Sequence, residues 1–180
     1  CILCVILTIN SCNKKNNERI VKIQEQVEQI KNSKLIFPDS LKIRYPNTNT
    51  IHSQLIETDK NYKVVTFING ECGSCINQLN AWKNIIPYLK SFHEIKFIPI
   101  IYISDLEIFK NKMLPNIHLN TPLYIDFNHN LYNSNKLYKF DYSLHTFLID
   151  NNDKIILVGN PTHNDKLMKL YKDEINKRVK

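Results

Sequence analysis

One stretch of this sequence restricts the possible folds more than any other. Val64 to Ile68 is a β-branched and aromatic run, typical of a buried strand, and Asn69-Gly70 turns the chain. A Cys-x-x-Cys, formed by Cys72 and Cys75, follows at once and opens a segment with the apolar spacing of a helix. A strand that passes directly into a helix, with two thiols at the junction, predicts an α/β layer architecture.

The rest of the apolar pattern extends this unit. After the first strand and helix, the order is strand, helix, short strand, hairpin and helix, which indicates a mixed sheet. Pro87 lies inside the first helix and would kink it, and Ser104 is the expected cap of the second. The expected strands are Tyr62–Ile68, Ile95–Ile103, Leu123–Asp126, His145–Asp150 and Ile155–Gly159, and the expected helices are Cys72–Phe92, Asp105–Met113 and Asn164–Arg178.

The position of the two cysteines favours thiol chemistry. Unpaired backbone N–H groups and the helix dipole stabilise a thiolate at a helix N-terminus, so Cys72 is the expected nucleophile. Cys75 lies one turn further along the helix, close enough to attack a mixed disulfide on Cys72 and release the product. We therefore expect Cys72 to be exposed and Cys75 to be buried.

The first residues have the pattern of an export signal. Cys1 to Ile9 is an apolar run that is too short to span a bilayer, which needs about 20 apolar residues. It is typical of the hydrophobic part of a signal peptide, and the ending before Cys12 resembles the lipobox of bacterial lipoproteins. Acylation of Cys12 would leave Cys72 and Cys75 as the free thiols of the mature protein. A plain signal peptide and a signal anchor are the alternatives.

Two motifs carry a resemblance to a known family. The stretch ending in Cys72 and Cys75 resembles the active site of thioredoxin-fold proteins. Thr146–Asp150, followed by Lys154-Ile155 and Gly159, resembles the penultimate hairpin of the TlpA/ResA branch of bacterial thiol–disulfide oxidoreductases. The resemblance covers about two thirds of the chain, from Tyr62 to Lys177, and implies an α/β thioredoxin-like fold, a central mixed sheet flanked by helices. It further implies protein thiols or disulfides as partners, a membrane electron donor for the dithiol, and no cofactor.

The sequence departs from that family beside the dithiol. The family's cis-proline is replaced by Leu144, for which we predict a trans bond, because a non-proline cis bond costs about 2.5–4 kcal/mol. Glu71 replaces an aromatic residue, and its carboxylate would oppose thiolate formation. Thr66 stands where thioredoxin has a buried acid. We expect His145 to lie near the dithiol, where an imidazolium would favour the thiolate.

These patterns together suggest how the chain is divided. We predict a signal peptide over 1–11, a lipid-anchored tether over 12–19, an N-terminal extension over 20–60 and a thioredoxin-like domain over 61–180. The pattern of Glu18–Lys31 indicates an amphipathic helix that packs on the domain or pairs with another helix. Short extended stretches broken by Pro38 and Pro46 follow it and suit edge strands. The predicted location is the cell envelope, facing the periplasm or the exterior of a bacterium.

Other functions fit the sequence less well. The formal charge of +7 comes from scattered basic residues without a zinc finger or an RNA-binding signature, so nucleic-acid binding is not expected. A zinc site would need two more Cys or His ligands, and Cys1 and Cys4 lie in the apolar run that would be removed with the signal peptide, so no metal is predicted. His145 is the candidate third ligand in that alternative, and His52, His93, His118, His129 and His163 lack supporting spacing.

Two further enzyme classes are disfavoured by single motifs. A peroxiredoxin would carry Thr-x-x-Cys, whereas the sequence reads Asn69-Gly70-Glu71-Cys72. A Ser-His-Asp hydrolase would need a nucleophile-elbow pattern, which is missing from this sequence. Two hypotheses therefore stay open, an exported thiol–disulfide oxidoreductase and a thioredoxin-fold binding or structural lipoprotein with an inert disulfide.

Overall fold

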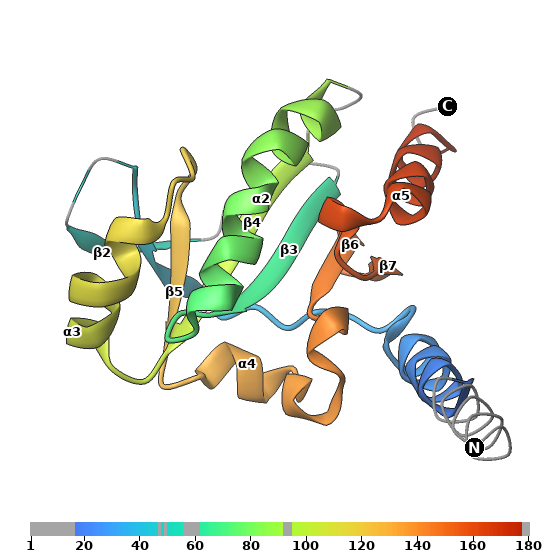
Figure 1. Ribbon diagram of the computed structural model, residues 1–180, viewed down its shortest axis with the longest axis horizontal. Helices are drawn as coiled ribbons and strands as arrows, with labels where there is room; N and C mark the ends of the chain where they lie inside the picture. The colour runs from blue at the N-terminus through green and yellow to red at the C-terminus, as the bar shows by residue number, and fades with distance from the viewer. Residues whose placement is uncertain (1–16, 47, 49, 56–61, 92–94, 178–180) are drawn as a thin grey trace, which may run out of the picture.

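The computed structural model describes residues 17–46, 48, 50–55, 62–91 and 95–177 (Figure 1). In this part of the chain the backbone forms a seven-stranded sheet in the order β2-β1-β5-β4-β3-β6-β7. The strands are β1 (Ser40–Arg44), β2 (Ile51–Leu55), β3 (Tyr62–Asn69), β4 (Ile95–Ile103), β5 (Leu123–Phe127), β6 (Thr146–Asp150) and β7 (Ile155–Val158).

The centre of the sheet is parallel and its flanks are antiparallel. β3 pairs with β4 in parallel along its whole length, from Tyr62 opposite Ile95 to Asn69 opposite Tyr102. β5 continues the parallel part beside β4, while β6 and β1 pair antiparallel with β3 and β5. β3 and β4 are almost wholly buried, as expected for strands covered on both faces, and this explains their continuous apolar runs.

Helices cover both faces of this sheet. α2 (Gly73–Lys90) and α5 (Asp165–Lys177) pack on one face, through side chains that include Leu79, Trp82 and Tyr171. The other face carries a helix over 17–30 and α4 (Asn130–Ser134), and Figure 1 shows α4 below the sheet and the helix over 17–30 at the lower right. The sheet order and the helices on both faces confirm the predicted α/β thioredoxin-like architecture.

The N-terminal segment is tied to the sheet by its backbone. Ile23, Val27 and Ile30 of the helix over 17–30 pack on the apolar layer beneath them, so the amphipathic helix packs on the domain, as one of the two expectations had it. Residues after the helix then pair with the turn between β6 and β7. Ile155 N–H donates to the Ser33 carbonyl at 2.8 Å, and Leu35 N–H donates to the Asp153 carbonyl at 2.8 Å.

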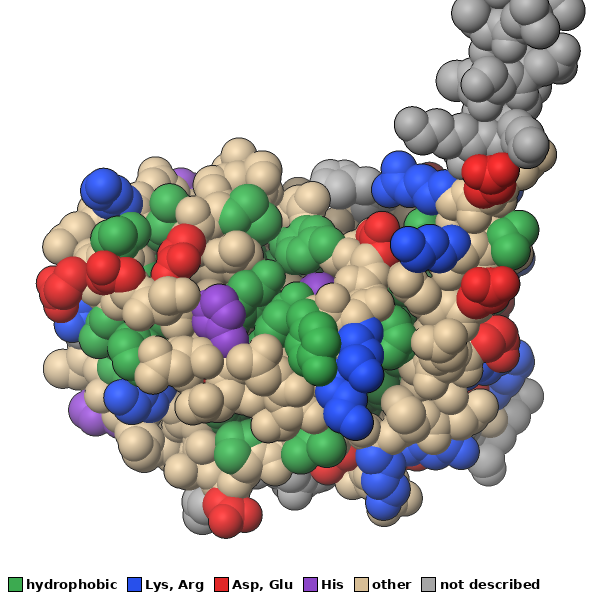
Figure 2. Space-filling view, turned by 90° about the horizontal axis from the view of Figure 1, so that it is seen from below, with side chains coloured by type: hydrophobic (Ala, Val, Ile, Leu, Met, Phe, Trp, Pro, Cys, Tyr) green, Lys and Arg blue, Asp and Glu red, His purple; other side chains and the backbone are tan. Residues whose placement is uncertain are grey.

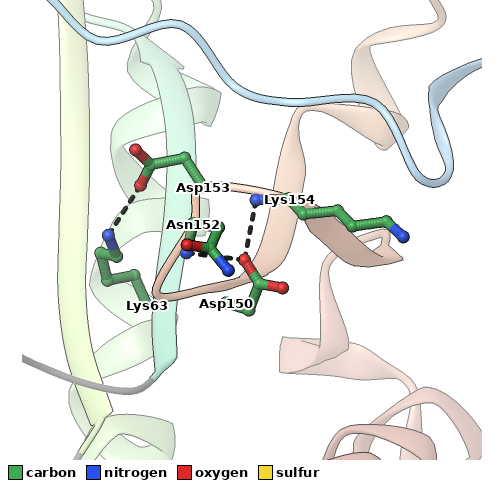
Figure 3. Close-up of polar contacts among 5 residues, drawn as sticks. All are labelled: Lys63, Asp150, Asn152, Asp153 and Lys154. Atoms are coloured by element: carbon green, nitrogen blue, oxygen red, sulfur yellow. Dashed lines mark hydrogen bonds and ion pairs between the residues drawn. The ribbon is translucent and has the colours of Figure 1, made fainter.

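An ion pair between a buried lysine and a half-buried aspartate lies at the same turn (Figure 3). Lys63, in the central strand β3, has a side chain with 0% exposure, and its Nζ donates to Asp153 Oδ1 at 2.7 Å. Asp150 Oδ1 accepts the backbone N–H groups of Asn152 and Lys154, which closes the turn. We call this region, Lys63 with residues 150–154, the lysine end of the sheet.

Several local expectations need correction. β1 was expected at an edge, but it lies between β2 and β5, and β2 forms the edge. The helix expected over Asp105–Met113 is α-helical only in α3 (Leu106–Ile108) and continues as a π-helical turn over Phe109–Met113. Its cap is Asp105, whose Oδ1 accepts the Ile108 N–H at 2.9 Å, and not Ser104. α4 was not anticipated, and none of the described helices is long and apolar enough to cross a membrane.

Candidate active site

The turn between β3 and α2 places the dithiol at the end of the sheet opposite the lysine end. Gly70 N–H donates to the Tyr102 carbonyl of β4 at 3.0 Å, which draws the turn onto the sheet. A Cβ on Gly70 would lie 2.5 Å from Ile103 Cγ2 and 2.7 Å from Ile101 Cγ2, so only glycine fits there. The Asn69 side chain accepts the Glu71 N–H at 2.9 Å. We call residues 69–75 and their neighbours the dithiol end.

Cys72 and Cys75 form a disulfide at the start of α2, with their Cα atoms 5.2 Å apart. Cys72 is the N-cap residue and has an extended backbone, and its sulfur accepts the Cys75 N–H at 3.3 Å. The hydroxyl of Ser74 lies 3.2 Å from the same sulfur. Cys72 is half-buried, whereas Cys75 is buried with 7% exposure. In the reduced state, donors at this position would stabilise a thiolate on Cys72.

Glu71 makes contacts that its position in the sequence did not suggest. Its Oε1 accepts the backbone N–H of Ser104 at 2.6 Å and that of Asp105 at 2.9 Å, both in the loop after β4. The sequence indicated only a charge that opposes the thiolate. The signal that was missed is topological, because β3 and β4 are parallel and the residues after their carboxyl ends meet at one edge.

Leu144 lies in a tight turn just before β6. No cis peptide bond occurs among the described residues, so the bond before Leu144 is trans. Tyr142–Leu144 forms a 3₁₀ turn capped by Asp141, whose carboxylate accepts the Ser143 N–H at 3.0 Å. The Leu144 N–H donates to the Asp141 carbonyl at 2.9 Å, and the His145 N–H donates to the Tyr142 carbonyl at 3.2 Å. These N–H groups are therefore used within the turn and are not offered to an incoming peptide strand.

His145 does not take the role that the sequence suggested. Its ring lies between the rings of Tyr132 and Tyr142, with centroid distances of 5.5 and 5.4 Å, and its Nε2 lies 3.1 Å from the Leu137 carbonyl. Tyr132 packs against the apolar layer on the face opposite α2. Burial lowers the pKa of His145 below its ordinary value, which favours the neutral ring. A charged imidazolium at His145 is therefore disfavoured.

Thr66 lies on β3, three residues before the strand ends, and is buried. Its Oγ1 lies 2.8 Å from Thr146 Oγ1 on the neighbouring strand β6. Where thioredoxin would have an acid, the two buried hydroxyls satisfy each other.

The remaining candidate ligands and sites lie elsewhere. His129 Nε2 lies 3.2 Å from Ser104 Oγ, and His52 Nε2 lies 3.2 Å from Thr50 Oγ1. Within the described ranges, no group of three or more His, Cys, Asp or Glu side chains gathers as a metal site would require. Cys12 and His93 lie outside the described residues.

The surface around this end is mixed in character. Figure 2 views the molecule from the side on which α4 lies in Figure 1. Hydrophobic side chains gather in the middle of this face beside a histidine, acidic side chains lie at the left margin, and basic and acidic side chains are mixed on the right. Exposed aromatic residues on the segment before β6 include Tyr138, at 60% exposure, and Tyr142.

Known proteins resemble this chain in structure but not in sequence. No protein-family model matches the chain, and no curated protein matches it in sequence. Solved structures do match. A candidate protein disulfide isomerase from Bacteroides thetaiotaomicron superposes with a TM-score of 0.58 at 17% identity, covering 82% of this chain and 88% of the other.

Two further structures extend the comparison. A thioredoxin-like protein from Porphyromonas gingivalis gives a TM-score of 0.55 at 15% identity, covering 82% of this chain and 96% of the other. A Plasmodium vivax 2-Cys peroxiredoxin gives a TM-score of 0.57 at 15% sequence identity, covering 84% of this chain and 99% of the other. The chain has a thioredoxin-like fold. Because this fold is shared by disulfide isomerases and peroxiredoxins among these neighbours, the activity has to be argued from the dithiol itself.

Proposed function

We propose that this protein is an exported thiol–disulfide oxidoreductase that exchanges disulfides with protein partners through Cys72 and Cys75. The observation that carries the proposal is the disulfide at the start of α2, with the more exposed Cys72 as the N-cap residue and Cys75 buried behind it. An accessible sulfur at a helix N-terminus is the arrangement that lowers a thiol pKa and exposes it to a partner.

The reaction follows from the two positions. In the reduced protein, the Cys72 thiolate attacks one sulfur of a partner disulfide, which forms a mixed disulfide and releases the other partner sulfur as a thiolate. Cys75 then loses its proton and attacks Cys72 Sγ, which forms the Cys72–Cys75 disulfide and releases the second partner thiolate. Two electrons pass to the partner. The reverse sequence oxidises a partner dithiol, and a membrane electron donor would restore the reduced protein after the forward reaction.

A pair of single-cysteine variants tests this assignment. Cys75→Ser should accumulate mixed disulfides with partner proteins, because the resolving thiol is gone, and Cys72→Ser should form none. Gly73→Ala is the matched control, since it lies between the two cysteines, leaves both in place, and its added Cβ would meet nothing within 4 Å. Non-reducing electrophoresis with mass spectrometry reads the result. Trapped partners on Cys72→Ser, or equal alkylation of both thiols in the reduced protein, would overturn the roles.

One observation favours a second candidate, a thioredoxin-fold binding or structural module with an inert disulfide. The turn over Tyr142–Leu144 uses its own backbone N–H groups, so this edge is less suited to hold a peptide substrate. The reduction potential of the Cys72–Cys75 pair separates the candidates. A potential near that of known thiol reductants or oxidants supports exchange, whereas a disulfide that resists the glutathione pool, with a potential below about −300 mV, supports the module.

We further propose that Cys12 is acylated and anchors the protein to a membrane of the cell envelope. The support is the short apolar run that ends at Cys12. Mass spectrometry of the mature N-terminus tests the proposal. A diacylglyceryl-modified peptide that begins at Cys12 is expected, and an unmodified peptide that reads through Cys12 would exclude the anchor.

A further inference from the structure

Glu71 joins the dithiol turn to the loop after β4. It immediately precedes Cys72, and its backbone N–H is already held by the Asn69 side chain at 2.9 Å. Its Oε1 accepts two backbone N–H groups, from Ser104 at 2.6 Å and from Asp105 at 2.9 Å. The residue next to the nucleophile is thus fixed through both its backbone and its side chain. We call the carboxylate of Glu71 with these two amides the clamp.

The loop on the other side of the clamp is itself well held. Ser104 Oγ lies 3.2 Å from His129 Nε2, at the carboxyl end of β5. Asp105 Oδ1 accepts the Ile108 N–H and caps α3. Phe109, just beyond, is wholly buried and lies beneath Gly70, 3.2 Å from where a Cβ would be. The clamp therefore connects Cys72 to a loop that is anchored in the core, so it can transmit rigidity to the turn.

We propose that Glu71 is a positioning residue for the dithiol: its hydrogen bonds hold the turn so that Cys72 stays within reach of Cys75. Two effects of the side chain are then opposed. Its negative charge disfavours the Cys72 thiolate, while its hydrogen bonds keep the nucleophile where Cys75 can resolve it. The loop after β4 presents two N–H groups that need an acceptor, and the Glu71 carboxylate supplies it.

The geometry allows the two effects to be separated. Both N–H groups donate to the same atom, Oε1, so a glutamine carbonyl oxygen can accept both without carrying charge. Glu71→Gln therefore removes the charge and keeps the clamp, whereas Glu71→Ala removes both. Ser104→Ala is the matched control, because it deletes the hydroxyl that meets His129 and leaves the backbone N–H that Glu71 binds.

The experiment compares these variants in the full chain with three readouts. Hydrogen exchange at the Ser104 and Asp105 amides reports the clamp. The pH midpoint of Cys72 alkylation in the reduced protein reports the charge. The rate at which Cys75 displaces a small thiol from a preformed mixed disulfide on Cys72 reports the positioning, and only this readout rests on the proposed function.

We expect Glu71→Gln to keep slow amide exchange, to lower the Cys72 midpoint and to resolve the mixed disulfide within about twofold of the wild-type rate. Glu71→Ala should share the lower midpoint, lose amide protection and resolve about tenfold more slowly, because the two sulfurs are no longer held in line. Ser104→Ala keeps the clamp but loses the hydroxyl contact with His129, so it should keep the wild-type alkylation midpoint and stay closer to the wild-type protein than Glu71→Ala in the other two readouts.

Equal resolution rates and equal amide exchange in Glu71→Gln and Glu71→Ala would overturn the positioning role. So would amide protection that is lost in Ser104→Ala as fully as in Glu71→Ala. If the wild-type mixed disulfide does not resolve at all, the proposed function fails. Amide exchange and the alkylation midpoint then still decide whether the clamp acts on Cys72.

Discussion

The two ends of β3 differ in what their polar groups do. At the lysine end, Lys63 is wholly buried and reaches across to Asp153, and the segment over 32–35 pairs with the same turn (Figure 3). At the dithiol end, polar contacts run between loops that are partly exposed, and one sulfur is open to a partner. A buried charge needs a partner to be tolerated, whereas a reactive thiol needs access. Stability and reactivity are thus assigned to opposite ends of one strand.

The largest effect is expected at the lysine end. Asp153→Gly should lower the free energy of unfolding by about 3–5 kcal/mol, because it leaves the buried ammonium of Lys63 without its carboxylate. Glycine suits the positive φ of 61° at this position, so the backbone is not strained by the change. Urea unfolding measures the loss, and alkylation of Cys72 in the folded protein should not change.

Asp153→Asn is the control for that variant. It also tolerates the positive φ and keeps an oxygen that can accept from Lys63 Nζ, so its loss should be smaller. A loss of unfolding free energy below about 1 kcal/mol in Asp153→Gly, or a change in Cys72 reactivity, would contradict the conclusion that the lysine end serves stability and the dithiol end serves reactivity.

The next effect sharpens the comparison at the dithiol end. Gly70→Ala should cost about 1–3 kcal/mol, since its Cβ would overlap the side chains of Ile101 and Ile103. Gly73→Ala, three residues away, meets nothing within 4 Å and should be neutral or stabilising by up to about 1 kcal/mol. Thermal and urea unfolding compare the two variants. Equal losses would show that the turn is not packed as tightly as described.

A smaller effect is expected between the two ends, at the paired hydroxyls. Thr66→Val should cost about 1–2 kcal/mol, because it leaves Thr146 Oγ1 buried without its partner. The double variant Thr66→Val with Thr146→Val should recover most of that loss, as both polar groups are then gone. A double-mutant cycle measures the coupling. Additive losses would indicate that the two hydroxyls do not depend on each other.

The smallest effect concerns the pH dependence of stability. Burial lowers the pKa of His145 below its ordinary value of 6.5, so below that pH the unfolded chain takes up a proton that the folded chain resists. Stability should be full above about pH 6.5 and should fall as the pH drops below it. His145→Gln should reduce the difference between unfolding free energies measured near about pH 7.5 and about pH 5.5.

Asp141 acts in a separate range and serves as the internal check. Hydrogen bonds from Ser143 lower the pKa of this carboxyl below 3.8, so its contribution is present above that value and is lost at lower pH. The Asp141 charge also raises the pKa of His145, so Asp141→Asn should keep the dependence near His145 or make it steeper, and should not remove it. An unchanged pH dependence in His145→Gln would contradict the assignment.

The parallel centre of the fold could be predicted from sequence because the signal there is local. Tyr62–Ile68 and Ile95–Ile103 are continuous apolar runs, and buried parallel strands require such runs. β2 could not be predicted, since Ile51–Leu55 has only two apolar residues and is defined by its pairing with β1. α4 has five residues and is begun by Asp126, a strand residue whose two carboxylate oxygens accept the Leu131 and Tyr132 N–H groups.

In the candidate site, too, the parts with a local sequence signal could be predicted and the parts set by long-range contacts could not. The two cysteines and their order come from a short motif at a strand–helix junction, which the structure places as expected. His145 was expected beside the dithiol from its position in the chain, but it ends a 3₁₀ turn and its ring packs against those of Tyr132 and Tyr142. His145 falls on the side of Phe147, away from α2, and the contacts of Glu71 cross 33 and 34 residues of sequence.

The direction of the helix over 17–30 has a practical consequence. Gln26 Oε1 accepts the Asp141 N–H just before the turn that leads to β6, while Asn32 reaches Ile155 near the lysine end. The chain therefore enters the fold on the dithiol side, and α5 ends on the opposite side (Figure 1). The end of α5 therefore lies away from the start of α2, where Cys72 is the N-cap residue, so a label placed after Lys177 would leave the approach to Cys72 open. Labels for partner-trapping experiments belong at the carboxyl end.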